Sequence, residues 1–313
     1  MKKINVVFFG TPDFSVPTLD SLLNHPSVNI KYVISMPDRK SGRGQNEKSP
    51  EVISFSKEKK IPFFQTDNIN KEDDFISQLE MQDIDCFIVL AFAQFLGERV
   101  LNIPKSGCFN IHTSLLPKYR GAAPIQYALL NGDVSTGVSI QKMVKKMDAG
   151  DLCWSDSVNI SNNETGGQLY TRLKFQAALS ANNFINAFIA KELKFEAQDE
   201  SLVSFAPTLK REDGFLDFKN EKSQNILNKI NALYPWPGTY CFLGAKRLKV
   251  FYAKLSSKKI ECGEINTQYN EIHIGCLDHA IQLCEIQLEG KKRCSVIELF
   301  NGLRSDITIN KEV

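Results

Sequence analysis

The sequence predicts an α/β protein in which a doubly wound N-terminal domain is followed by a smaller β-barrel domain. Two observations lead to this class. Short apolar runs alternate with helical patterns over residues 1–190, which is typical of a sheet with helices on both faces. Short β-like segments separated by turn residues dominate residues 208–313, as in small barrels. We therefore expect a mixed, polar linker at 191–207 between the two domains.

Four short apolar runs are expected to form strands of the N-terminal sheet. The third is almost uninterrupted, as in a central parallel strand that is covered on both faces. In chain order they are Ile4–Phe9, Ile30–Ser35, Cys86–Leu90 and Cys108–His112.

Helices are expected where apolar residues recur every three or four positions. These segments begin near residues 16, 50, 125 and 169. Ser49 and Pro50 suit an N-cap and a first helical position, and Gly132 suits a helix end. Thr165–Gln168 resembles a capping box at the start of the last and longest helix.

The C-terminal domain is expected to contain three clear strands and a short helix. The strands are Leu248–Leu255, Glu271–Cys276 and Ile281–Leu288, and the helix covers Val296–Phe300 before Gly302. Glycine, serine, asparagine and aspartate separate these segments, which indicates turns.

Composition excludes several classes of protein. The 313 residues carry a net charge of +2, with 42% hydrophobic and 24% charged residues, so charge alone does not indicate a nucleic-acid partner. The longest apolar run, residues 86–93, is too short to span a membrane. The eight cysteines include no CxxC pair, so we expect reduced thiols and a cytoplasmic protein. His273, Cys276 and His279 lack an obvious fourth ligand, and no metal is expected.

Asn110, His112 and Asp148 are the candidate catalytic residues. Side chains alternate along a strand, so Asn110 and His112 would share one face while Phe109 and Ile111 pack on the other. Ligands of open α/β sheets bind beyond the carboxyl ends of strands. Asp148 follows the strand-like residues 138–143, so side chains from two strand ends could converge. From spacing alone, a turn aspartate and a structural histidine are the more common case.

Residues 110–125, NIHTSLLPKYRGAAPI, together with MDAGD at 147–151, resemble the signature of the folate-dependent formyltransferases. The C-terminal segments resemble the members that act on methionyl-tRNA. The similarity covers nearly the whole chain, at residues 9–14, 37–44, 131–137, 210–218, 234–239 and 290–292.

This resemblance implies a Rossmann-like N-terminal domain and an OB-like C-terminal barrel. The implied reaction moves the formyl group of 10-formyltetrahydrofolate to the α-amino group of methionyl initiator tRNA, for translation initiation. Asn110 would donate a hydrogen bond to the oxyanion. His112 would carry a proton, and Asp148 would orient the imidazole. No metal is required.

The resemblance also implies binding residues for both substrates. Folate would contact Phe92, Ala93, Gln94, Phe95 and Leu96, and also Ser114, Leu115, Leu116 and Pro117. The tRNA would contact Arg43, Lys246, Arg247 and Lys249.

Other functions remain open at this point. A sugar-nucleotide N-formyltransferase shares the same three residues. A glycinamide ribonucleotide formyltransferase would lack the second domain, and a formyltetrahydrofolate hydrolase would use water as acceptor. A catalytically silent RNA-binding module is disfavoured by the intact triplet Asn110, His112 and Asp148. Nothing in the sequence demands more than a monomer.

Overall fold

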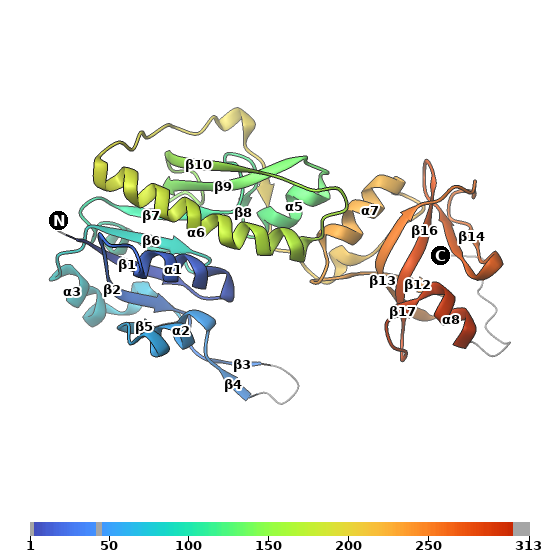
Figure 1. Cartoon of the computed structure of the whole chain (residues 1–313), viewed down its shortest axis with the longest axis horizontal. Coiled ribbons are helices and arrows are strands. Elements are labelled where there is room, and N and C mark those ends of the chain that lie inside the picture. The colour runs from blue at the N-terminus through green and yellow to red at the C-terminus, as the bar shows by residue number, and fades with distance from the viewer. Residues whose placement is uncertain (1–2, 42–45, 303–313) are drawn as a thin grey trace. The chain divides into compact units, whose positions relative to one another are not determined.

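The computed structural model describes residues 3–41 and 46–302 (Figure 1). The chain divides into two compact units. The first contains Met1–Pro124, Ser135–Asn159 and Tyr170–Ala206. The second contains Ile125–Val134, Ile160–Leu169 and Pro207–Val313. No helix within the described ranges is long and apolar enough to cross a membrane.

The first unit is built on a seven-stranded sheet of order β10-β9-β7-β6-β1-β2-β5. The strands from β7 to β5 are parallel to their neighbours. The edge pair β9 and β10 is antiparallel. The bounds are β1 Ile4–Gly10, β2 Val28–Ser35, β5 Phe63–Gln65, β6 Cys86–Leu90, β7 Cys108–His112, β9 Ser135–Lys142 and β10 Leu152–Asn159.

Helices cover both faces of this sheet, which confirms the doubly wound class. On one face Phe109 packs against Phe184 of α6 (Figure 1). On the other face Phe9 packs with Phe87 in a core that α3 and α4 complete. The helices are α1 Val16–Leu23, α2 Glu51–Lys59, α3 Asp73–Glu80, α4 Glu98–Leu101 and α6 Gly166–Ala190.

The start of α6 follows from a capping box. Gln168 Oε1 accepts the Thr165 backbone N–H at 2.9 Å, and Thr165 Oγ1 accepts that of Gln168 at 3.3 Å. This confirms the predicted motif. The expected cap of α2 is wrong by one residue, because Pro50 is the N-cap. The Ser49 hydroxyl donates instead to Asp38 Oδ2 at 2.8 Å.

Several short elements complete the two units. The pairs β3 with β4 and β8 with β11 form two small ribbons. Short 3-10 turns occur along the chain. The bounds are β3 Arg39–Ser41, β4 Asn46–Lys48, β8 Arg120–Gly121 and β11 Phe205–Ala206, with turns at Asp13–Ser15, Ile69–Lys71, Glu200–Leu202, Glu212–Gly214 and Gln268–Asn270.

The second unit is a curled antiparallel sheet of order β12-β13-β16-β15-β14, with β17 paired to β16. It confirms the smaller barrel-like domain. Ile226 of α7 and Leu299 of α8 pack into its core. The bounds are α5 Pro124–Leu130, α7 Ser223–Ala232, β12 Thr239–Leu243, β13 Lys246–Leu255, β14 Ile265–Asn266, β15 Ile272–Gly275, β16 Ala280–Leu288, β17 Cys294–Ser295 and α8 Val296–Gly302.

Candidate active site

Strand β7 places Asn110 and His112 on one face of the sheet, as the alternation of side chains predicts. Phe109 and Ile111 are buried, and Phe109 lies against α6 with ring centroids 4.9 Å from Phe184. Cys108 belongs to the core on the opposite face. Asn110 and His112, at two-residue steps from Cys108, therefore share that face.

Asp148 also lies there, but not because the end of its preceding strand lies beside the end of β7, as expected from the sequence. Strand β9 is antiparallel to β7, with Asn110 opposite Gln141 and His112 opposite Ser139. Its end at Lys142 therefore lies near the start of β7, away from His112. The connection to β10 folds back, and Gly150 permits this because a Cβ there would clash with the Lys142 carbonyl oxygen. Asp148 itself has a left-handed backbone, with φ of 48°.

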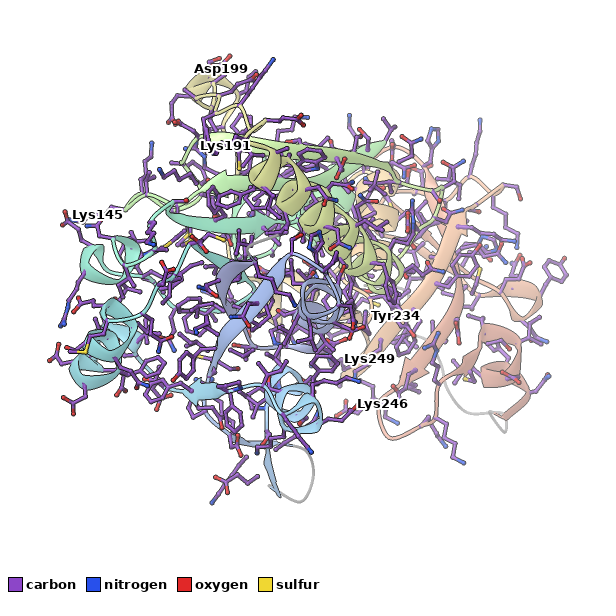
Figure 2. All side chains as sticks on the ribbon, turned by 60° about the vertical axis from the view of Figure 1, so that its left-hand side comes forward. Lys145, Lys191, Asp199, Tyr234, Lys246 and Lys249 are labelled. Atoms are coloured by element: carbon purple, nitrogen blue, oxygen red, sulfur yellow. The ribbon has the colours of Figure 1, made fainter. Side chains whose placement is uncertain are left out.

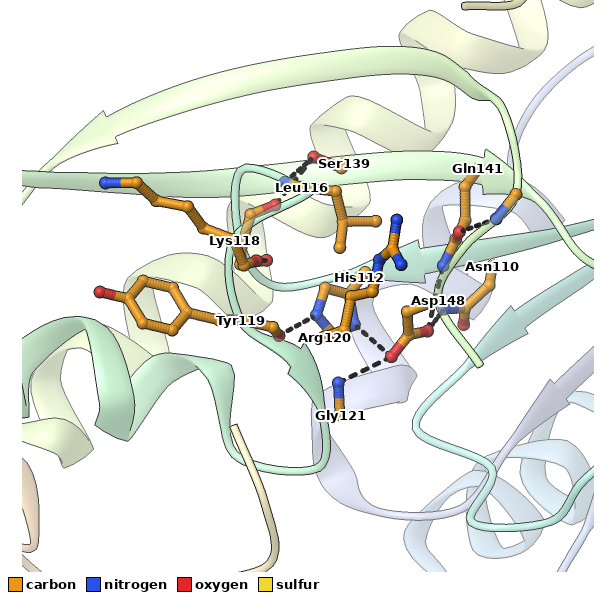
Figure 3. Close-up of polar contacts among 12 residues, drawn as sticks. Asn110, His112, Leu116, Lys118, Tyr119, Arg120, Gly121, Ser139, Gln141 and Asp148 are labelled. Atoms are coloured by element: carbon orange, nitrogen blue, oxygen red, sulfur yellow. Dashed lines mark hydrogen bonds and ion pairs between the residues drawn. The ribbon is translucent and has the colours of Figure 1, made fainter. Parts of the chain in front are cut away.

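The Asp148 carboxylate is held by neighbours on three sides (Figure 3). Its Oδ2 accepts the Gly121 backbone N–H at 2.9 Å and lies 3.8 Å from His112 Nδ1. Its Oδ1 accepts the side-chain amides of Gln141 at 3.0 Å and Asn110 at 3.3 Å. The three predicted catalytic side chains therefore converge in this structure, and the carboxylate is only 12% exposed.

The tautomer of His112 follows from its backbone partner. Nε2 lies 2.8 Å from the Tyr119 carbonyl oxygen, which can only accept a hydrogen bond. Nε2 therefore carries the hydrogen, and in the neutral ring Nδ1 is the free proton acceptor. The ring is 6% exposed, with Nδ1 directed to the Asp148 side.

The loop after β7 is tied to β9 at Ser139, the residue opposite His112. Ser139 Oγ donates to the Ser114 carbonyl at 2.8 Å and accepts the Leu116 backbone N–H at 3.1 Å. Ser114 and Leu116 are both buried. This loop is thus fixed to β9 by one serine hydroxyl.

A cavity of about 620 Å³ lies at the start of β7 and the end of β9, and none of Asn110, His112 and Asp148 is among its lining residues. Its wall includes Cys108, the residue before Phe109 on β7, and Lys142, the residue after Gln141 on β9. Burial raises the pKa of the Cys108 thiol to about 12, so it remains a neutral wall residue rather than a nucleophile. The wall also includes Phe95, Leu101, Ser106, Met143, Val144 and Lys145.

Of the predicted folate residues, only Phe95 lines this cavity. Phe92 and Leu96 are core residues, and Ala93 has a left-handed φ of 60°. The Gln94 side chain bonds the Ile69 N–H and the Thr66 carbonyl. Leu115 and Pro117, like Ser114 and Leu116, are not among the lining residues. Sequence reasoning missed the wall from residues 143–145, because a short loop carries no periodic signal.

Two glutamines beside the site were also missed. Gln141 is a buried polar residue of β9, and its alternation with Ser139 on a strand that pairs with β7 was a usable signal. Gln198 lies in the predicted linker, where no motif or periodicity in the sequence distinguishes it from its neighbours.

The predicted tRNA residues lie in the second unit, except Arg43, which falls outside the described residues. Lys246 and Lys249 are exposed on β13. The Arg247 guanidinium lies 3.6 Å from the Tyr240 ring centroid. Within residues 3–41 and 46–302, no group of three or more histidine, cysteine, aspartate or glutamate side chains could hold a metal ion.

The doubly wound fold, with Asn110, His112 and Asp148 converging at one point of its sheet, is the arrangement expected of the one-carbon transferases that the sequence resembles. Residues 2–182 match the formyl transferase family, and residues 208–304 match the formyl transferase C-terminal domain. The chain therefore belongs to the formyl transferase family, and within it to the methionyl-tRNA formyltransferases, on the relatives that follow.

Two relatives match nearly end to end. The methionyl-tRNA formyltransferase of Geobacter sulfurreducens is 37% identical over 97% of this chain and 95% of its own. That of Halothermothrix orenii is 38% identical over 96% and 97%. Solved structures share the fold at lower identity. The sugar 3N-formyl transferase WlaRD, at 19% identity, has a TM-score of 0.68 and covers 93% of this chain and 100% of its own.

Proposed function

We propose that this protein transfers the formyl group of 10-formyltetrahydrofolate to the α-amino group of methionyl initiator tRNA. One observation carries the proposal: an amide, a free imidazole nitrogen and a carboxylate converge at one point of the sheet. The near full-length relatives bear the name of this activity. The product would serve translation initiation in the cytoplasm, and we expect a monomer to suffice.

Asn110 would stabilise the charge that develops on the formyl oxygen. Attack by the neutral amine on the formyl carbon gives a tetrahedral oxyanion, and a positioned amide N–H favours it. The Asn110 amide has two N–H donors, and one of them faces Asp148 Oδ1 at the long distance of 3.3 Å. The other is available to the substrate.

His112 Nδ1 would take the proton that the attacking nitrogen loses and return it to the departing folate nitrogen. Asp148 Oδ2, 3.8 Å away, would stabilise the imidazolium between the two steps. No covalent intermediate with the protein is needed. Tyr119, rather than Asp148, fixes the ring tautomer here.

The cavity is proposed for the part of the folate that lies away from the formyl group, since Asn110, His112 and Asp148 do not line it. Its volume lies within the usual range for small-molecule sites, and its wall combines the apolar Leu101, Met143 and Val144 with the polar Ser106. Folate contact by Phe92–Leu96 and Ser114–Pro117 stays a prediction that rests on the resemblance. Sugar-nucleotide formyl transfer is the main alternative, because sugar formyltransferases share this fold.

One assay separates these two functions. The protein is incubated with 10-formyltetrahydrofolate and either methionyl initiator tRNA or an amino-sugar nucleotide. We expect formyl-methionine on the tRNA and no formylated sugar. Formylated amino-sugar without formyl-methionine on the tRNA would assign the protein to the sugar formyltransferases.

Filling the cavity should impair folate binding selectively. Ser106 is an exposed lining residue, so Ser106→Trp should raise the KM for 10-formyltetrahydrofolate at least roughly tenfold, or about 1.4 kcal/mol. The KM for tRNA should stay nearly constant. Met81→Trp, at a position 88% exposed outside this wall, is the matched control. Unchanged folate KM in Ser106→Trp would place folate elsewhere.

Removing a lysine from β13 should weaken tRNA binding and its salt dependence. Lys246 and Lys249 are exposed cations on this strand (Figure 2), and each phosphate contact releases counterions. Lys249→Ala should raise the KM for tRNA and lower the slope of log K against log salt by about one. Lys194→Ala, an exposed lysine of the first unit, is the control. Arg43 is proposed as a further tRNA contact on the resemblance alone. An unchanged slope in Lys249→Ala would remove β13 from the interface.

A further inference from the structure

The segment after α6 is part of the catalytic unit rather than a free linker. Glu196 pairs with Leu152 of β10 through two backbone hydrogen bonds of 2.8 and 2.9 Å. Phe205 and Ala206 pair with Arg120 and Gly121. Figure 2 labels Lys191 and Asp199 along this segment. Gln198 lies between the two attachments.

Gln198 holds the backbone on both sides of Ala149. Its Nε2 lies 2.9 Å from the Asp148 carbonyl oxygen and 2.8 Å from that of Gly150, and 3.2 Å from Gln141 Oε1. All three atoms are acceptors. The amide orientation is fixed independently, because Oε1 accepts from Arg120 Nε at 3.1 Å and Nη2 at 2.8 Å.

Arg120 anchors this arrangement in the interior. The guanidinium is 1% exposed and ends between Gln198 and Glu200. A buried arginine keeps its position because moving it would strip a charge of its partners. Hydrogen bonds from Arg120 and Lys146 lower the pKa of Glu200 to about 2, so this partner stays ionised.

We propose that Gln198 is a positioning residue for Asp148, an inference that rests on the proposed function. Gly121 and Gln141 hold the carboxylate, and Gln198 holds the left-handed backbone that carries it. Asp148 lies in a connection whose residues 144–147 are exposed, so local packing supplies little of this restraint. A displacement of about 1 Å at a reacting group can cost about 100-fold in rate.

Gln198→Glu is the decisive variant. The carboxylate keeps an acceptor for Arg120 but faces the carbonyl oxygens of Asp148 and Gly150 without a donor, so the turn is released. We expect kcat to fall at least roughly tenfold while the KM values for folate and tRNA stay within about twofold. In the Asp148→Asn variant, adding Gln198→Glu should lower kcat little further, since both substitutions act through the Asp148 carboxylate.

Glu200→Gln is the matched control, because it alters the other Arg120 partner and touches no atom of residues 148–150 in the contacts described. Its kcat should stay within about twofold of wild type. Gln198→Asn, which shortens the amide, replaces Gln198→Glu if thermal melting shows that the latter does not fold.

Three results would overturn the inference. They are an unimpaired kcat in the Gln198 variant, losses that multiply with Asp148→Asn, and an equal loss in Glu200→Gln. A wild-type protein that fails to formylate methionyl-tRNA would instead overturn the proposed function.

Discussion

Replacing His112 with alanine is expected to lower kcat for formyl transfer at least roughly 100-fold, the scale of general acid–base catalysis. The ring supplies the one proton acceptor that faces Asp148, because Nε2 is committed to the Tyr119 carbonyl. Without the ring, the proton of the attacking amine would have to pass to water. The KM for folate should change little, since His112 is not among the cavity-lining residues.

The measurement is single-turnover transfer at saturating substrates, which separates chemistry from binding. His279→Ala is the control, because His279 is an exposed histidine of the second unit. Melting curves check that the variant is folded, since His112 is buried. Turnover close to wild type would remove His112 from the mechanism.

Replacing Asn110 with alanine is expected to cost about 2.7–4 kcal/mol, or about 100- to 1,000-fold in kcat, as for other single oxyanion donors. The amide is preorganised by β7 and by its contact with Asp148 Oδ1. Gln141 also donates to Oδ1, so the carboxylate keeps one amide partner in the variant. The loss should therefore report on the missing donor more than on a displaced Asp148.

Gln141→Leu tests whether the loss comes from the missing oxyanion donor or from a displaced Asp148. It removes the other amide that donates to Asp148 Oδ1 and leaves Asn110 in place. We expect a smaller loss from Gln141→Leu than from Asn110→Ala in the same single-turnover assay. Equal losses would mean that both act only by holding Asp148. A loss below about fivefold in Asn110→Ala would contradict the oxyanion role.

Much of the first domain follows from local patterns in the sequence. The apolar runs at β1, β2, β6 and β7 are visible because buried parallel strands need uninterrupted apolar residues. The shared face of Asn110 and His112 needs only the alternation of side chains. The α6 cap needs only the Thr165–Gln168 pair.

What escaped prediction depends on pairing across the chain. The reversed direction of β9 cannot be seen in residues 135–142, because the composition of a strand does not reveal its direction. The cavity wall at 143–145 and the partner Gln198 come from segments without periodicity. The position of Gln198 is set by hydrogen bonds to residues about 50 positions away, which no local pattern encodes.

The Tyr119 carbonyl that binds His112 Nε2 also determines which ring nitrogen can gain and lose a proton in the proposed reaction. With that nitrogen occupied and the ring 6% exposed, a proton accepted at Nδ1 has no exit through the far side of the imidazole. It must leave by the atom at which it entered. In the proposed mechanism, the proton therefore arrives at and departs from a single nitrogen.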